Sequence, residues 1–132
     1  MGYAAGASAS LKLSKYGVEH LDELQNIIDN EDDYAFDEIE ISNNYQGAAV
    51  LWLCKYAGEN YHEEETLEFL SKIEPFIEDG EQIEYLGEDG SEWAFRFLHS
   101  KNTNGIAECV CEKSWTATQV WDAKNQSWKF LK

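Results

Sequence analysis

The side chains most able to do chemistry in this chain are its carboxylates. Residues 19–92 hold 23 of the 26 acidic residues and only two basic ones, Lys55 and Lys72. The formal net charge of the chain is −16, whereas a magnitude of about 2–8 keeps a small domain soluble. Such an excess lowers stability through self-repulsion, and its field attracts basic surfaces. Two interpretations stay open: a solvated acidic surface, and a docking surface for a basic protein.

The sequence shows no catalytic or metal-binding signature. His20, His62 and His99 lie outside any local nucleophile or metal motif. The run beginning His62-Glu63-Glu64-Glu65 lacks the second histidine that a helical zinc site needs. Residues 29–40 lack the glycine of a calcium-binding loop. We therefore expect a protein that is not an enzyme and that needs no metal or other cofactor.

Charge and composition exclude several classes of partner. With a pI near 4.3 and Arg96 as the one arginine, direct binding to nucleic acid or to an anionic membrane is not expected. Residues 1–10 lack the basic region and the long apolar stretch of a signal peptide, so we expect no secretion signal, and no apolar run is long enough to span a membrane. An odd number of cysteines, at positions 54, 109 and 111, favours free thiols and a location in a reducing cytoplasm.

The periodicity of the apolar residues predicts the elements that must position these carboxylates. Alternation predicts strands, and spacing by three and four predicts helices. The predicted strands are 8–13, 36–41, 47–56, 82–86, 92–98, 106–112, 115–121 and 127–131, and the predicted helices are 18–29 and 63–77, with a break near Pro75. The sequence therefore predicts one α+β domain over residues 1–132, a mostly antiparallel β-sheet with two α-helices packed on one face.

An apolar run and a pair of tryptophans in the predicted strands indicate which residues form the core. The nearly continuous apolar run 47–56 suits a central strand that is covered on both faces, although its periodicity also fits a buried helix. In the C-terminal strands, a period of two places Trp115 and Trp121 on the same face. These indoles serve either as core anchors or as an exposed binding platform.

The sharpest local motif is the segment Gly87-Glu88-Asp89-Gly90-Ser91-Glu92-Trp93. Two glycines around two acids predict a hairpin turn, after which Trp93 begins the next strand. Alternatively, an acidic tip beside an indole is a contact site for arginine or lysine. The longer segment 83–93 resembles segments of small proteins from bacteriophages and mobile elements. That class includes inhibitors of bacterial defence such as anti-CRISPR proteins, and the resemblance implies this kind of role without assigning residues.

The charge pattern and the resemblance lead to one functional prediction with two alternatives. We expect a non-enzymatic inhibitor that binds a basic nucleic-acid-binding protein, such as a CRISPR effector nuclease, and blocks its nucleic-acid site. The alternatives are an immunity protein that neutralises a toxin nuclease, and a small ligand-binding domain. The predicted partner-binding residues are Asp32, Asp33, Glu38, Glu40, Glu63, Glu64, Glu65, Glu88, Asp89 and Trp93.

Overall fold

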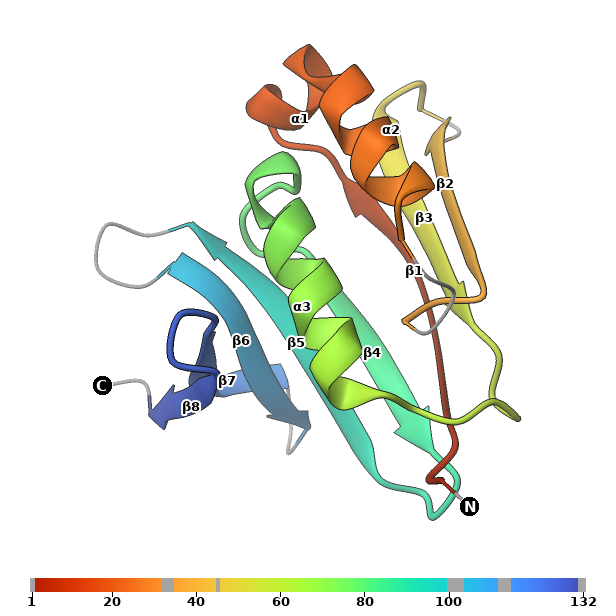
Figure 1. Ribbon diagram of the computed structural model, residues 1–132, viewed down its shortest axis with the longest axis vertical. Coiled ribbons are helices and arrows are strands. Elements are labelled where there is room, and N and C mark those ends of the chain that lie inside the picture. The colour runs from red at the N-terminus through yellow and green to blue at the C-terminus, as the bar shows by residue number, and fades with distance from the viewer. Residues whose placement is uncertain (1, 32–34, 45, 100–103, 112–114, 131–132) are drawn as a thin grey trace.

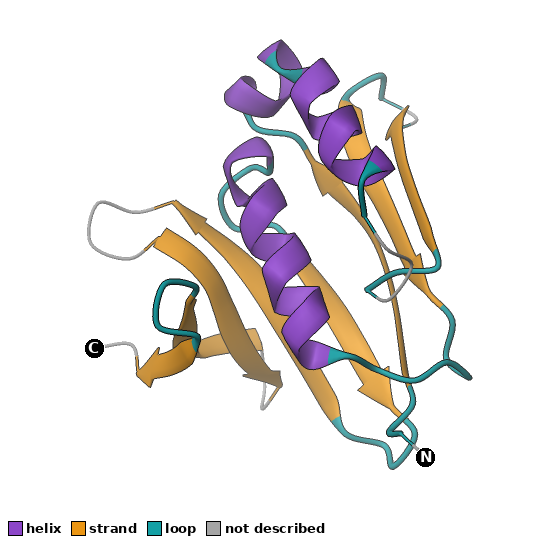
Figure 2. Ribbon diagram, in the orientation of Figure 1, coloured by secondary structure: helices purple, strands orange, loops and turns teal. Residues whose placement is uncertain are grey.

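The computed structural model contains one large β-sheet with helices over it (Figures 1 and 2). It describes residues 2–31, 35–44, 46–99, 104–111 and 115–130. The strands are β1 (Ala5–Lys12), β2 (Glu38–Asn43), β3 (Ala49–Lys55), β4 (Gln82–Gly87), β5 (Glu92–His99), β6 (Asn104–Cys111), β7 (Trp115–Asp122) and β8 (Ser127–Phe130). The α-helices are α1 (Lys15–Glu19), α2 (Leu21–Asp29) and α3 (Glu63–Ile73), and a 3₁₀ turn, η1 (Glu74–Phe76), follows α3. This confirms the predicted order of strands and helical regions and the mostly antiparallel α+β class.

The eight strands are ordered β2-β3-β1-β4-β5-β6-β7-β8, and every neighbouring pair is antiparallel. The N-terminal strand β1 lies between β3 and β4. The first part of the chain therefore follows the β-α-β-β-α-β connectivity of the split β-α-β motif. Strands β5 to β8 extend that sheet as a meander, which carries the C-terminal hairpin to one edge.

The N-terminal helical region differs from the prediction because it contains two helices. Residue His20 has non-helical dihedrals (φ −127°, ψ 42°) and separates α1 from α2. Its Nδ1 lies 2.8 Å from the carbonyl oxygen of Tyr16, and the two rings stack at 4.0 Å. The imidazole thus contacts the Tyr16 carbonyl, while the His20 amide donates to the Gly17 carbonyl instead of to the carbonyl four residues earlier. The structure therefore has three α-helices among its described residues, where the sequence predicted two.

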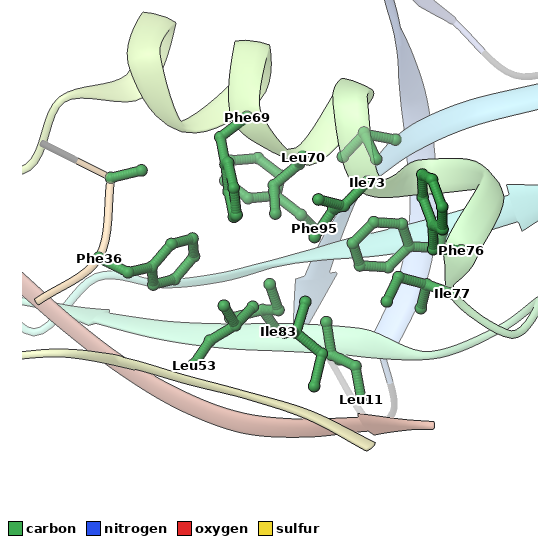
Figure 3. Packing of buried hydrophobic residues seen from close by; sticks show 14 of the residues in the cluster. Leu11, Phe36, Leu53, Phe69, Leu70, Ile73, Phe76, Ile77, Ile83 and Phe95 are labelled. Atoms are coloured by element: carbon green, nitrogen blue, oxygen red, sulfur yellow. The ribbon is translucent and has the colours of Figure 1, made fainter. Parts of the chain in front are cut away.

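The core lies between the helices and the sheet (Figure 3). Helix α3 crosses over the middle of the sheet (Figure 1) and buries residues at spacings of three and four, among them Leu67, Leu70 and Ile73. Phe69 meets Phe36 edge to face at 5.9 Å, which ties α3 to the segment before β2. Each fully buried large side chain stabilises the fold by about 1.5–3 kcal/mol. The core members at the centre of this layer are Leu11, Leu51, Leu53, Ile83, Phe95 and Phe97.

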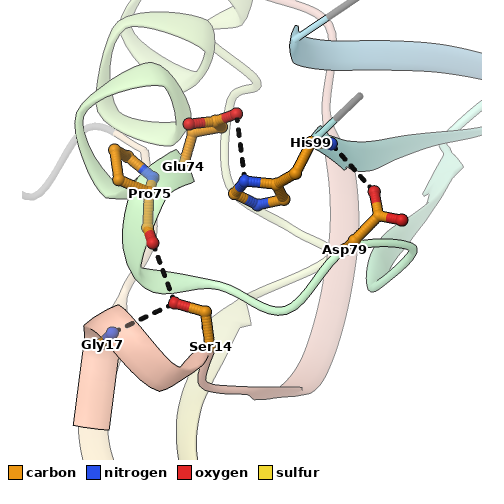
Figure 4. A network of polar contacts seen from close by, with 6 residues as sticks. All are labelled: Ser14, Gly17, Glu74, Pro75, Asp79 and His99. Atoms are coloured by element: carbon orange, nitrogen blue, oxygen red, sulfur yellow. Dashed lines mark hydrogen bonds and ion pairs between the residues drawn. The ribbon is translucent and has the colours of Figure 1, made fainter. Parts of the chain in front are cut away.

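The end of α3 is tied to α1 by a small polar network (Figure 4). The Ser14 hydroxyl donates to the Pro75 carbonyl oxygen at 2.8 Å and accepts the Gly17 amide at 3.0 Å, so it caps α1. The Ser14 amide donates to the Phe76 carbonyl oxygen at 2.9 Å. Helix α3 ends at Ile73, as the position of Pro75 predicts.

The same network reaches strand β5 through His99. Its Nδ1 lies 3.6 Å from a carboxylate oxygen of Glu74, and its amide donates to Asp79 at 2.8 Å (Figure 4). Burial raises the pKa of Glu74, and the neighbouring imidazole opposes that rise. Residues 74–79 are therefore held on both sides, by α1 and by the end of β5.

Strand β3 is an interior strand, as predicted, but its face opposite the helices is only partly covered, because Val50 is buried there and the residues that follow on that face are not. Leu51 and Leu53 are fully buried beneath the helices. Trp52 and Cys54 point to the opposite face and are only half-buried. The apolar run therefore reflects one helix-covered face and one partly exposed aromatic face.

A β-bulge separates the two indoles that the sequence placed together. The β6–β7 register shifts between Glu108, which pairs with Gln119, and Cys109, which pairs with Ala117. The extra residue on β7 reverses the direction of the side chains that precede it. Trp121, opposite Ile106, therefore faces the helix side, and residue 115 faces the other side. The prediction that Trp115 and Trp121 share a face is wrong for this reason.

The three α-helices are 5, 9 and 11 residues long, and most of their exposed side chains are charged. Within the described ranges, none has the length and apolar character needed to cross a membrane.

Candidate functional site

The structure distributes the predicted acidic residues over three separate places. Glu38 and Glu40 lie on the edge strand β2, residues 63–65 form the first turn of α3, and Glu88 and Asp89 lie in the β4–β5 turn. Predicted residues Asp32 and Asp33 lie outside the described residues. The β2 carboxylates alternate with isoleucines that pack on the core, so they point away from the helix side. The acidic surface therefore does not lie on a single face.

The β2 carboxylates are engaged locally. Glu38 accepts the Tyr56 hydroxyl at 2.6 Å, and this hydrogen bond is the main reason that the pKa of Tyr56 rises to about 12. Glu40 stands opposite Trp52 in the β2–β3 register. Charged residues on an edge strand also oppose edge-to-edge pairing with other chains. Protection of the β2 edge is therefore a sufficient structural role for these acids.

The β4–β5 turn confirms the predicted hairpin and also anchors the N-terminus. Gly90 has a φ of +87°, as a tight hairpin turn requires. The Ala4 amide donates to Glu88 at 2.7 Å, and Asp89 accepts both the Tyr3 hydroxyl and the Ser91 amide. The hydrogen bond from Tyr3 lowers the pKa of Asp89. Both carboxylates therefore have partners inside the fold.

Trp93 lies in an aromatic cluster beneath the start of α3. Its ring is parallel to that of Tyr85 at a centroid distance of 5.4 Å, and it contacts Tyr61 at 5.2 Å. Tyr3 adds a third ring at 6.2 Å. These contacts favour the core-anchor interpretation of Trp93 over that of a partner contact.

The first turn of α3 is the strongest concentration of predicted residues. Glu63, Glu64 and Glu65 are all exposed, at a helix end where the free amides favour negative charge. Although the residue as a whole is exposed, partial desolvation of its carboxyl group raises the pKa of Glu63, and the charges of Glu108 and Glu64 raise it further. Among the described residues, none of these three glutamates has a basic partner. Their mutual repulsion is a cost that a basic partner would relieve.

A groove runs between α3 and the β7–β8 hairpin next to these glutamates. Its volume is about 400 Å³. The side chains that matter for its chemistry are Glu64, Glu65, Glu68, Lys72, Trp121 and Gln126. We call it the α3–hairpin groove. It combines carboxylates with an indole, and these are the groups that bind cationic side chains in protein interfaces.

Sequence reasoning identified two of the groove's acids, Glu64 and Glu65, and missed Glu68. The signal for Glu68 was present, because residues four apart lie on the same helix face. Trp121 was recognised only as either a core anchor or a platform. Its position beside α3 depends on the bulge and on strand order, which local periodicity does not encode.

No protein-family model, curated protein or solved structure matches this chain. In the part of the chain that the structure describes, no group of three or more His, Cys, Asp or Glu side chains could hold a metal ion. What the arrangement offers chemically is a set of exposed carboxylates beside an aromatic wall. Such a surface binds cations of the arginine and lysine type.

Proposed function

We propose that this protein is a non-enzymatic inhibitor that binds a basic nucleic-acid-handling protein and blocks its nucleic-acid site. A CRISPR effector nuclease in a bacterial cytoplasm is the kind of partner that fits. The observation that supports this most directly is the group of exposed carboxylates in the first turn of α3, without basic partners in the described residues, beside the α3–hairpin groove. In this role, as in a DNA mimic, carboxylates take the place of nucleic-acid phosphates.

The magnitude of the charge supports a partner that is reached by electrostatic steering. A net charge of −16 accelerates encounter with a basic groove and repels nucleic acid from the same site. Aromatic residues at the edge of the acidic surface add the anchors that interfaces use. Trp121 lines the groove, and Phe130 on β8 is 83% exposed. Charge raises the association rate constant, and burial of these rings lowers the dissociation rate constant.

The proposal is tested with a panel of purified basic nucleases. The tagged protein is incubated with CRISPR effectors loaded with guide RNA and with bacterial toxin nucleases, at about 0.1 M and about 1 M salt. Over this range the Debye length falls from about 10 Å to about 3 Å. We expect capture of a CRISPR effector at low salt, release at high salt, and inhibition of DNA cleavage by the captured enzyme.

Matched variants locate the surface. Glu63→Gln/Glu64→Gln/Glu65→Gln removes three charges from α3, and a control removes the carboxylates of residues 38, 40 and 84 from the helix-free side. Loss of capture in the first variant only supports the proposal. Equal capture by both variants and the wild type refutes it. Selective capture of a toxin nuclease would instead identify an immunity protein, and binding to no nuclease would favour a ligand-binding domain.

A further inference from the structure

The wall of the α3–hairpin groove is rigid before any partner binds. Trp121 meets Trp128 edge to face at 5.3 Å, and Trp128 in turn stacks over Phe95 in the core at 6.1 Å. Asp122 organises the turn that follows, because it accepts the amides of residues 124 and 125 and pairs with Lys129 at 2.8 Å. A preorganised aromatic wall lowers the entropic cost of binding.

The opposite wall of the groove carries uneven charge. Glu64 and Glu65 have no basic partner among the described residues, whereas Glu68 pairs with Lys72 at 3.6 Å. That pair is highly exposed and lies within one helix, so it contributes little to stability. A stronger cationic ligand can therefore displace Lys72 at small cost, which frees Glu68 as a third carboxylate of the groove.

The combination of an indole and carboxylates discriminates between cations. A guanidinium is planar and can stack on an indole while its N–H fork pairs with a carboxylate. An ammonium is compact and strongly hydrated, and it gains less from such a wall. The volume of about 400 Å³ suits one extended side chain together with part of its backbone.

We propose that the α3–hairpin groove captures an arginine side chain from the basic surface of a partner, with Trp121 as the stacking wall and Glu64 and Glu68 as charge partners. This inference rests on the proposed function and makes it specific, because it selects arginine over lysine and one groove over the rest of the acidic surface. Trp121 is the anchor of the contact, and Glu65 contributes at the rim.

The test uses the full chain with hexa-arginine and hexa-lysine peptides, which carry equal charge. The readout is the indole N–H signal of Trp121 in ¹H–¹⁵N NMR spectra, assigned with the Trp121→Phe variant. We expect hexa-arginine to shift this signal saturably, with at least about fivefold higher affinity than hexa-lysine. No shift of the Trp121 signal, or equal affinity for the two peptides, overturns the inference.

Charge variants test the other wall of the groove. Glu64→Gln/Glu68→Gln should weaken hexa-arginine binding by about fivefold or more. Glu38→Gln/Glu40→Gln removes the same charge from β2 and should leave the Trp121 response unchanged within about twofold. Equal weakening by both variants would mean unspecific attraction and would overturn the inference. All four glutamates are exposed, so folding is preserved, and a thermal melt verifies it.

The two proposals fail separately. If hexa-arginine binds in the groove but no nuclease is captured, the arginine site is supported and the inhibitor role is refuted. If the wild type and Glu64→Gln/Glu68→Gln capture a nuclease equally well, the inhibitor role is supported and the arginine site is refuted.

Discussion

Substitution of Gly17 by alanine tests how closely α1 packs on the end of α3. Gly17 is buried, and an added Cβ would lie 2.2 Å from the carbonyl oxygen of Phe76. The carbonyl carbon and Cα of the same residue would lie at 3.0 Å and 3.1 Å. All three atoms belong to the backbone, so no rotation of a side chain relieves the clash. The same oxygen accepts the Ser14 amide, so any movement also weakens that hydrogen bond.

The expected magnitude comes from opposing terms. Alanine is favoured over glycine inside a helix by about 1 kcal/mol. Overpacking a rigid site costs about 1–3 kcal/mol, and loss of the hydrogen bond to Phe76 costs about 1 kcal/mol more. We expect Gly17→Ala to lower the free energy of unfolding by about 2 kcal/mol. For a domain of this size, that change lowers the melting temperature by about 8 °C.

Urea denaturation followed by tryptophan fluorescence measures this change, with Gly58→Ala as the control. A Cβ at Gly58 would meet nothing within 4 Å, so its effect should stay within about 0.5 kcal/mol. Helix propensity alone predicts the opposite sign at Gly17. A Gly17→Ala variant as stable as the wild type, or more stable, would refute the close packing of α1 on η1.

Three further substitutions probe the core, the C-terminal turn and the N-terminal contact. Phe95→Ala should lower the free energy of unfolding by about 3–5 kcal/mol in urea denaturation, whereas Phe130→Ala, at an 83% exposed ring, should change it by less than about 0.5 kcal/mol. Hydrogen bonds from Lys129 and Asn125 lower the pKa of Asp122, so its stabilisation is complete above the unfolded pKa of about 3.9 and is lost as the pH falls below it. The difference in urea midpoint between the wild type and Asp122→Asn should therefore shrink as the pH is lowered from about 5 to about 2. Tyr3→Phe should raise the pKa of the Asp89 carboxyl toward its ordinary value in an NMR titration, and Tyr16→Phe should leave it unchanged.

Much of the fold was predictable because the deciding signals are local. Pro75 ends α3 through its own ring, and residues 87–90 form their hairpin turn because glycine supplies the positive φ at position 90. The alternating and helical patterns of apolar residues predicted the order of strands and helices along the chain. These features need information from only a few neighbouring residues.

The misplaced features depend on contacts that sequence spacing does not encode. The helical region breaks at His20, where the amide donates to Gly17 and the ring contacts the Tyr16 carbonyl. The bulge after Ala117 reverses the face of Trp115, since it depends on pairing with β6. The α3–hairpin groove joins Glu64 and Trp121 only because β5 to β8 continue the sheet to that side of α3. Its acids could be predicted from the sequence, but its aromatic wall could not.

The central position of β1 has a consequence for synthesis on the ribosome. This strand is synthesised before its partners β3 and β4, and Ala5 pairs with Gly87. Until residue 87 has left the exit tunnel, one edge of β1 has no strand to bind. Such long-range pairing slows folding and prolongs the exposure of an unpaired edge. The serines and Lys12 on β1, together with the acidic segments that follow it, are polar and charged residues of the kind that oppose aggregation of an unpaired edge.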